Sequence, residues 1–117
     1  MCMQRLRGAC HCGAVKFVVE TTVEELTTCD CSICTKKGAL MTKVHETALR
    51  ILSGRESLST YTFNTHTAQH YFCRTCGIYP FHRKRVTPDY YGVNVRCLEA
   101  FSTEGVPVRA TDGKGMC

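Results

Sequence analysis

The spacing of its cysteines constrains this chain more than any other feature. Seven of the ten cysteines fall into three tight groups: Cys10 and Cys12 in GACHCGAV, Cys29, Cys31 and Cys34 in CDCSIC, and Cys73 and Cys76 in FCRTCGIY. Cysteines this close in a chain chelate a metal more readily than they bridge each other. The N-terminal stretch lacks the apolar segment of a secretory signal, so we expect a reducing, cytoplasmic location. The pattern predicts metal binding rather than a disulfide framework.

Two of the groups together complete one site. Cys10, Cys12, Cys73 and Cys76 supply four thiolates, which is the ligand set of a closed structural zinc site. The two pairs are far apart in sequence, so only the fold can bring them together. The alternative for Cys73 and Cys76 is a redox Cys-x-x-Cys motif, which is expected in a thioredoxin-like βαβ context that this chain lacks.

The remaining group, Cys29, Cys31 and Cys34, has no fourth cysteine nearby. Catalytic zinc is commonly held by three protein ligands, with the fourth position left for water or substrate. Another side chain can instead close the site, the candidates being His11, His45, His66, His70, His82, Cys2, Cys97 and Cys117. Spacing alone supports an open and a closed site equally. Iron–sulfur ligation is disfavoured because the cysteine steps differ from those of known cluster motifs.

Short stretches rich in β-forming residues recur along the chain and predict an all-β domain. The predicted strands are residues 14–20, 39–44, 50–53, 58–63, 69–73, 78–83 and 91–98. At most one helical turn is expected, over residues 32–37, ended by Gly38. Cys97 is in phase with Val93 and Val95 in the last strand, so we expect it to be a small buried hydrophobe.

Length and charge limit the number of domains and the kinds of partner that this chain can have. With 117 residues and no linker-like run, we expect one domain over 1–117, with its core at about 8–101 and a loose tail at 110–117. No apolar run is long enough to cross a bilayer. The formal charge is +5, but seven thiolates and two zinc ions would lower it to about +2. This small charge does not favour nucleic acid as a partner, and the sequence leaves the oligomeric state open.

The motifs together resemble one family. GACHCGAV, CDCSICTKKGAL, the stretch 51–63, HYFCRTCGIYPFHRKR and YGVNVRCLEA match, in order and spacing, the glutathione-dependent formaldehyde-activating (GFA) family, also called CENP-V/GFA domains. The resemblance implies an Mss4-like (β-tent) zinc-binding fold with two zinc ions per chain. It implies a structural zinc on Cys10, Cys12, Cys73 and Cys76, and a catalytic zinc with an accessible position on Cys29, Cys31 and Cys34.

The resemblance also implies an activity. Members of this family are associated with forming S-(hydroxymethyl)glutathione from glutathione and formaldehyde, a carbon–sulfur lyase reaction. A zinc-bound thiol is deprotonated, and the thiolate is the nucleophile. The rival interpretations are a non-catalytic, zinc-stabilised binding module and a redox-active thiol protein of the same fold.

Basic side chains near the open site are candidates to orient the carboxylates of glutathione. Lys36 and Lys37 follow the cysteine triple directly, and Arg83, Lys84 and Arg85 follow the Cys73/Cys76 motif. For any single lysine, a solvated surface position is the more common role. Structural packing is likewise the favoured role for Tyr79 and His82, over a part in the site.

Overall fold

The computed structural model describes residues 4–23, 25–29, 32–62, 68–84, 87–99 and 101–111. Among them is one α-helix, α1 (Ser32–Lys37), with three short 3₁₀ turns, η1 (Glu46–Ala48), η2 (Arg55–Ser57) and η3 (Val95–Cys97). The strands are β1 (Gln4–Ala9), β2 (Lys16–Thr21), β3 (Leu26–Cys29), β4 (Met41–His45), β5 (Leu49–Ser53), β6 (Leu58–Tyr61), β7 (Gln69–Cys73), β8 (Phe81–Arg83), β9 (Tyr90–Asn94) and β10 (Val108–Thr111). No helix in these ranges is long and apolar enough to span a membrane.

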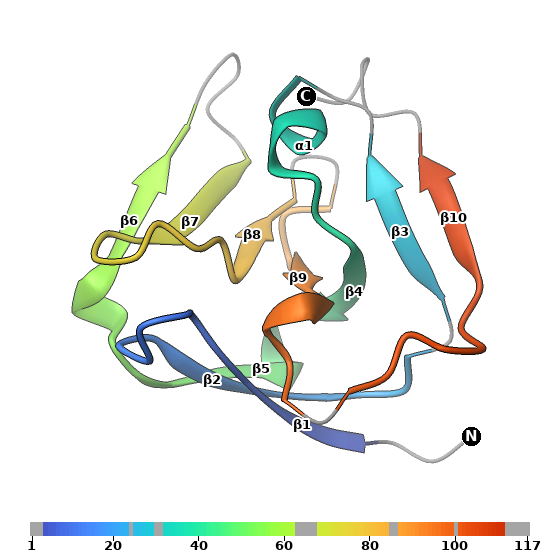
Figure 1. The fold of residues 1–117 in the computed structure, drawn as a ribbon, viewed down its shortest axis with the longest axis horizontal. Helices are drawn as coiled ribbons and strands as arrows, with labels where there is room; N and C mark the ends of the chain where they lie inside the picture. The colour runs from blue at the N-terminus through green and yellow to red at the C-terminus, as the bar shows by residue number, and fades with distance from the viewer. Residues whose placement is uncertain are drawn as a thin grey trace.

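The described strands form two sheets. The smaller sheet has the order β1-β2-β5, and the larger has the order β10-β3-β4-β9-β8-β7-β6. The larger sheet curves around the molecule, with β6 and β10 at its two sides and the smaller sheet across one end (Figure 1). Helix α1 lies at the other end of the view. The architecture is all-β and Mss4-like, as the sequence predicts.

The core lies between the two sheets. Phe17 of β2 and Phe81 of β8 meet edge to face, with ring centroids 5.4 Å apart. Val19 and Val93 are fully buried beside them. Three consecutive residues of β2, Phe17 to Val19, are buried, so both faces of the strand are covered at its middle. Burying a phenylalanine of this kind contributes about 2–3 kcal/mol.

Most predicted strands are present, although their ends differ. Strand β7 matches its predicted range, and β2, β4, β5 and β6 overlap theirs closely. The strand predicted at 78–83 begins only at Phe81, and residues 78–80 connect it to the Cys73–Gly77 turn. Helix α1 covers the predicted turn, and Gly38 after it has φ 62°, a left-handed conformation that ends helices.

Three strands were not predicted: β1, β3 and β10. Strand β1 carries exposed arginines and has few apolar residues, while β3 is only four residues long. Strand β10 pairs in parallel with β3, a contact between distant segments that has no local signal. Ala110 and Thr111, predicted to begin a loose tail, lie in β10, and residues 112–117 fall outside the described ranges.

The strand predicted at 91–98 is shorter than expected, which alters the environment of Cys97. Strand β9 ends at Asn94, whose side chain accepts a hydrogen bond from the amide of Arg96 and starts the η3 turn. The two-residue alternation therefore does not continue from Val93 to Cys97. Cys97 is half-buried against the core, and its burial raises the pKa of the thiol to about 11.

Candidate metal centre

Two tight turns place four cysteines together. Cys10 follows β1, and the turn after it is closed by the Cys10 amide donating to Val15 O at 3.1 Å. Cys73 ends β7, and the Cys73–Gly77 turn is closed by the Gly77 amide donating to Cys73 O at 2.7 Å. Gly77 has φ 77°, which strains any other residue type. Cys12 and Cys76 lie within these two turns.

The four sulfurs fit a tetrahedral metal. They lie within 4.8 Å of one another, so Cys10, Cys12, Cys73 and Cys76 can hold one metal ion. Cys12 Sγ is 3.6 Å from Cys10 Sγ and 3.7 Å from Cys73 Sγ. A tetrahedron with Zn–S bonds of about 2.3 Å has edges of about 3.8 Å. The sulfur-only ligand set and these separations suit zinc.

Backbone amides lower the pKa of two of the four thiols, those of Cys73 and Cys76. The amide of Val15 donates to Cys10 Sγ at 3.3 Å. Amides of Cys12 and Ile78 lower the pKa of the Cys76 thiol to about 6, and those of Cys76 and Thr75 lower the pKa of Cys73.

The pKa of the Cys12 thiol is raised instead. The amide of Ala14 lowers its pKa, but desolvation and the neighbouring thiols outweigh that and raise it to about 11. Four negative sulfurs at these distances repel one another. A divalent cation removes that repulsion, so ionisation of the full set is coupled to metal binding.

The second predicted site is only partly covered by the structure. Cys29 ends β3 and Cys34 lies in α1, but their side chains, like the whole of Cys31, are outside the described part of the chain. Of the proposed fourth ligands, His11 is exposed, whereas His70 and His82 are buried.

Tyr79 and His82 are buried side chains that bond to each other. The Tyr79 hydroxyl bonds to His82 Nδ1 and lies 3.2 Å from Gly92 O and 3.4 Å from Met41 Sδ. Both side chains are less than a tenth exposed. The Tyr79 main-chain oxygen accepts from Asn94 Nδ2 at 3.0 Å.

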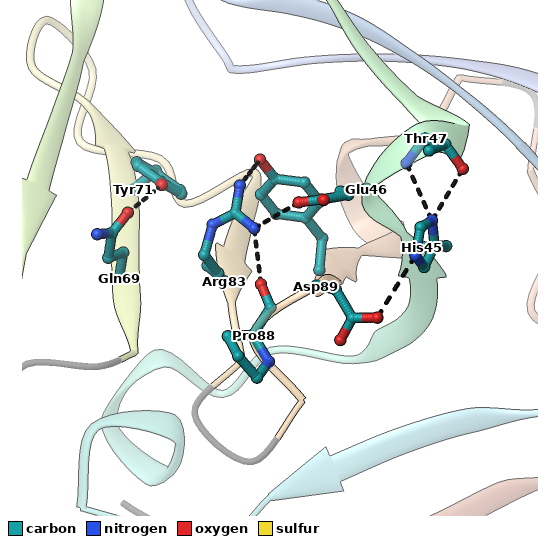
Figure 2. Close-up of polar contacts among 9 residues, drawn as sticks. His45, Glu46, Thr47, Gln69, Tyr71, Arg83, Pro88 and Asp89 are labelled. Atoms are coloured by element: carbon teal, nitrogen blue, oxygen red, sulfur yellow. Dashed lines mark hydrogen bonds and ion pairs between the residues drawn. The ribbon is translucent and has the colours of Figure 1, made fainter.

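The Arg83 guanidinium is engaged within the protein (Figure 2). It donates to Glu46 at 2.9 Å, to Pro88 O at 2.6 Å and to the Tyr91 hydroxyl at 2.6 Å. The Glu46 carboxylate, as the main cause, raises the pKa of Arg83. Its charge is therefore compensated internally, which makes Arg83 a weak candidate for orienting a carboxylate substrate. Arg85 lies outside the described residues.

The family model described as glutathione-dependent formaldehyde-activating enzyme matches residues 5–110. The chain belongs to this family. The match confirms the resemblance that the cysteine motifs indicate, and it spans all seven grouped cysteines. The family and the four-sulfur cluster together establish a GFA-family protein with a possible metal site.

A solved structure is similar to this GFA-family chain over most of its length. The crystal structure of a Rhodobacter sphaeroides protein is 44% identical in sequence and superimposes with a TM-score of 0.81. The similarity covers 88% of this chain and 99% of that chain.

Sequence reasoning missed one group of residues in this GFA-family protein. Lys37 Nζ lies 2.9 Å from Nδ1 of His70, and the two residues come from different parts of the chain. From the sequence, Lys37 is a candidate to orient a carboxylate and His70 is a candidate fourth ligand. No sequence spacing joins them, since the contact depends on how α1 packs beside β7.

Proposed function

We propose that this chain is a zinc-dependent carbon–sulfur lyase of the S-(hydroxymethyl)glutathione synthase type. Its substrates would be glutathione, or another small thiol, and formaldehyde or a related small electrophile. The observation that carries this proposal is the family match over residues 5–110, which includes the whole CDCSIC motif. We further propose that residues 1–117 form a single CENP-V/GFA domain that acts in the cytoplasm.

The seven grouped cysteines would divide into two ligand sets. A structural zinc would be held by Cys10, Cys12, Cys73 and Cys76. The distances between their sulfurs support this, because they suit a tetrahedral metal ion. A second, catalytic zinc would be held by Cys29, Cys31 and Cys34, with one position open. Thiolate sulfur is a preferred ligand of zinc.

The reaction needs an ionised thiol and a place for negative charge. A zinc ion on the three thiolates would lower the pKa of a bound thiol, so that it is ionised at neutral pH. A lone pair of the substrate sulfur forms the new C–S bond to formaldehyde. The carbonyl π pair moves to oxygen, which takes a proton and becomes the hydroxyl of the hydroxymethyl group. The thiol loses one proton when it ionises and the oxygen takes one up, so the reaction neither releases nor consumes a proton.

The test is NMR exchange spectroscopy of glutathione with formaldehyde at equilibrium. Thiols add to formaldehyde without an enzyme, so the measurement is best made near pH 6, where roughly 0.3% of a thiol with pKa 8.5 is ionised. The zinc-loaded wild type should raise the exchange rate above this background, and Cys31→Ser should remove the increase. Cys97→Ser is the matched control, since this thiol belongs to neither ligand set.

Two results would count against the proposal. A wild-type exchange rate equal to the background would rule out the synthase activity. A zinc content of one ion per chain, with three cysteines still reactive toward a thiol reagent, would instead indicate a redox protein. Two zinc ions per chain are expected.

A further inference from the structure

The four sulfurs of the metal cluster differ in how deeply they lie in the protein. Cys73 is fully buried and Cys10 is 5% exposed. Cys76 is partly exposed, whereas Cys12 is exposed. The other three cysteines pack with Val15 in one apolar cluster, and Cys12 stays outside it. One side of the four-sulfur group is therefore closed by packed side chains, and Cys12 lies on the side that faces solvent.

The turn that carries Cys12 projects into solvent. It connects β1 to β2, and His11, beside Cys12, is also exposed. A Cβ added to Gly13, the next residue, would meet no atom within 4 Å beyond its chain neighbours. A small molecule can therefore approach the Cys12 side chain, while packing closes the approach to Cys10 and Cys73.

Backbone amides are shared unevenly between the two sulfurs that are not buried. Cys76 accepts from two amides, those of Cys12 and Ile78. Cys12 accepts from one amide, that of Ala14. A hydrogen bond to a thiolate stabilises its charge and makes the sulfur a weaker nucleophile. Cys12 thus combines the greatest exposure in the cluster with less hydrogen bonding than Cys76.

We propose that Cys12 is a modification site, the place where small carbon electrophiles attack the four-sulfur cluster. This inference rests on the structural ligand set of the proposed function, Cys10, Cys12, Cys73 and Cys76. A zinc ion on this set keeps the sulfurs ionised, and the thiolate is the form of cysteine that reacts. Burial protects two of the sulfurs and amide hydrogen bonds moderate the third, so the reaction occurs at Cys12.

The modification removes one ligand of the metal. A lone pair of the Cys12 sulfur forms an S–C bond, and an alkylating agent such as iodoacetamide loses iodide with the electron pair of its C–I bond. The resulting thioether carries no charge, so it holds zinc less firmly than a thiolate does. Since a structural metal contributes directly to the free energy of folding, the modified protein is less stable. Formaldehyde, the proposed substrate, belongs to the same class of electrophile.

The first test maps the reaction of the zinc-loaded wild type with iodoacetamide. Mass spectrometry of peptides follows the alkylated fraction of each cysteine at early times. Cys12 should react about tenfold faster than the other three cysteines of the cluster, and Tm should fall as Cys12 is modified. Equal rates for the four cysteines, or Cys76 reacting first, would overturn the inference. The mapping needs no variant, so it decides the question even where a substitution disturbs the fold.

The second test replaces Cys12 by another zinc ligand. Histidine beside three cysteines is a common structural zinc set, so Cys12→His should keep its metal. Iodoacetamide should lower the Tm of this variant about tenfold more slowly than that of the wild type. Cys97→Ser, which removes a thiol outside the cluster, is the matched control and should respond like the wild type. The inference is wrong if Cys12→His and wild type lose stability at the same rate.

A chelator separates this inference from the proposed function. If removal of metal leaves all four alkylation rates unchanged, the structural ligand set is wrong and the inference falls with it. If the chelator changes these rates but Cys12 is not the first cysteine to react in the zinc-loaded protein, only the inference is wrong. A wild type that reacts first at Cys12 but does not catalyse glutathione exchange supports the inference and contradicts the proposed synthase activity.

Discussion

The sulfurs of Cys12 and Cys73 lie 3.7 Å apart although 61 positions separate the two residues in the chain. One belongs to the turn between β1 and β2, the other to the end of β7. A metal held there joins the two sheets at a second place, apart from the Phe17–Phe81 contact in the core. Stability and metal binding should therefore be coupled in this protein.

Replacing Cys76 with serine tests this coupling directly. Cys76→Ser removes one of the four ligands, and binding of a structural metal contributes directly to the free energy of folding. We expect the loss of one zinc ion per chain and at least about 3 kcal/mol of stability, a fall in Tm of roughly 10 °C. Metal analysis and thermal unfolding by circular dichroism measure both.

Cys97→Ser is the control for this substitution. Cys97 Sγ makes only a 3.6 Å contact with Tyr79 O and a 3.7 Å contact with Asn94 Nδ2 among the interactions described for it. The variant should keep the full metal content. A Cys76→Ser protein with unchanged Tm and zinc content would refute the structural assignment.

The buried imidazole of His70 should make stability depend on pH. Its pKa is about 4 in the folded protein and 6.5 when unperturbed. Between these values the unfolded chain binds more protons, so stability falls as pH decreases from about 6.5 toward 4. Between pH 7 and pH 4.5 the loss attributable to His70 should be about 2 kcal/mol. Urea unfolding at pH 7 and pH 4.5 measures it.

His70→Asn keeps a hydrogen-bond acceptor for Lys37 without a titrating ring. Its stability should therefore change less between these two pH values than that of the wild type. His11→Asn, at an exposed position, should retain the wild-type dependence. An identical pH dependence in His70→Asn and wild type would exclude His70 as the source. His82, whose pKa is also lowered, accounts for part of the remainder.

Gly92→Ala should be destabilising because of the ring beside it. The added Cβ would lie 2.5 Å from His82 Cε1, and this ring is buried and stacked on His70. Overpacking of this kind costs about 1–3 kcal/mol. In a His82→Ala background the added methyl group has space, so its cost should largely disappear. Urea unfolding measures the stability of the single and double variants. If the losses from Gly92→Ala and His82→Ala simply add in the double variant, the clash with the His82 ring is not the cause.

Two ion pairs of equal length should differ in their contribution to stability. Arg83–Glu46 and Arg109–Glu25 both have N···O distances of 2.9 Å, but the arginine side chains are 25% and 62% exposed. Arg83 also binds Pro88 O and the Tyr91 hydroxyl (Figure 2). Arg83→Met should therefore cost about 1–2 kcal/mol, and Arg109→Met should cost clearly less. Equal losses in chemical unfolding would show that burial does not distinguish the pairs.

The prediction of fold class from sequence succeeded where the signal was local. The stretch QHYFC has β-forming residues throughout, and strand β7 covers it fully. Gly38 predicted the end of α1 because its left-handed conformation is a property of the residue type. The grouping of Cys73 with Cys76 was likewise readable, since the turn that joins them is short.

The sequence by itself determined the ligand chemistry, the all-β class and the family. Only the tertiary structure decided which distant segments meet: β10 beside β3, the Cys12 sulfur beside that of Cys73, and Lys37 above His70 and Tyr79. Each of these contacts forms only when separate strands pack into the same sheet or core. The burial that lowers the pKa of His70 and the pairing that engages Arg83 arise from the same packing. Local residue type cannot encode them, because they depend on the distances between elements.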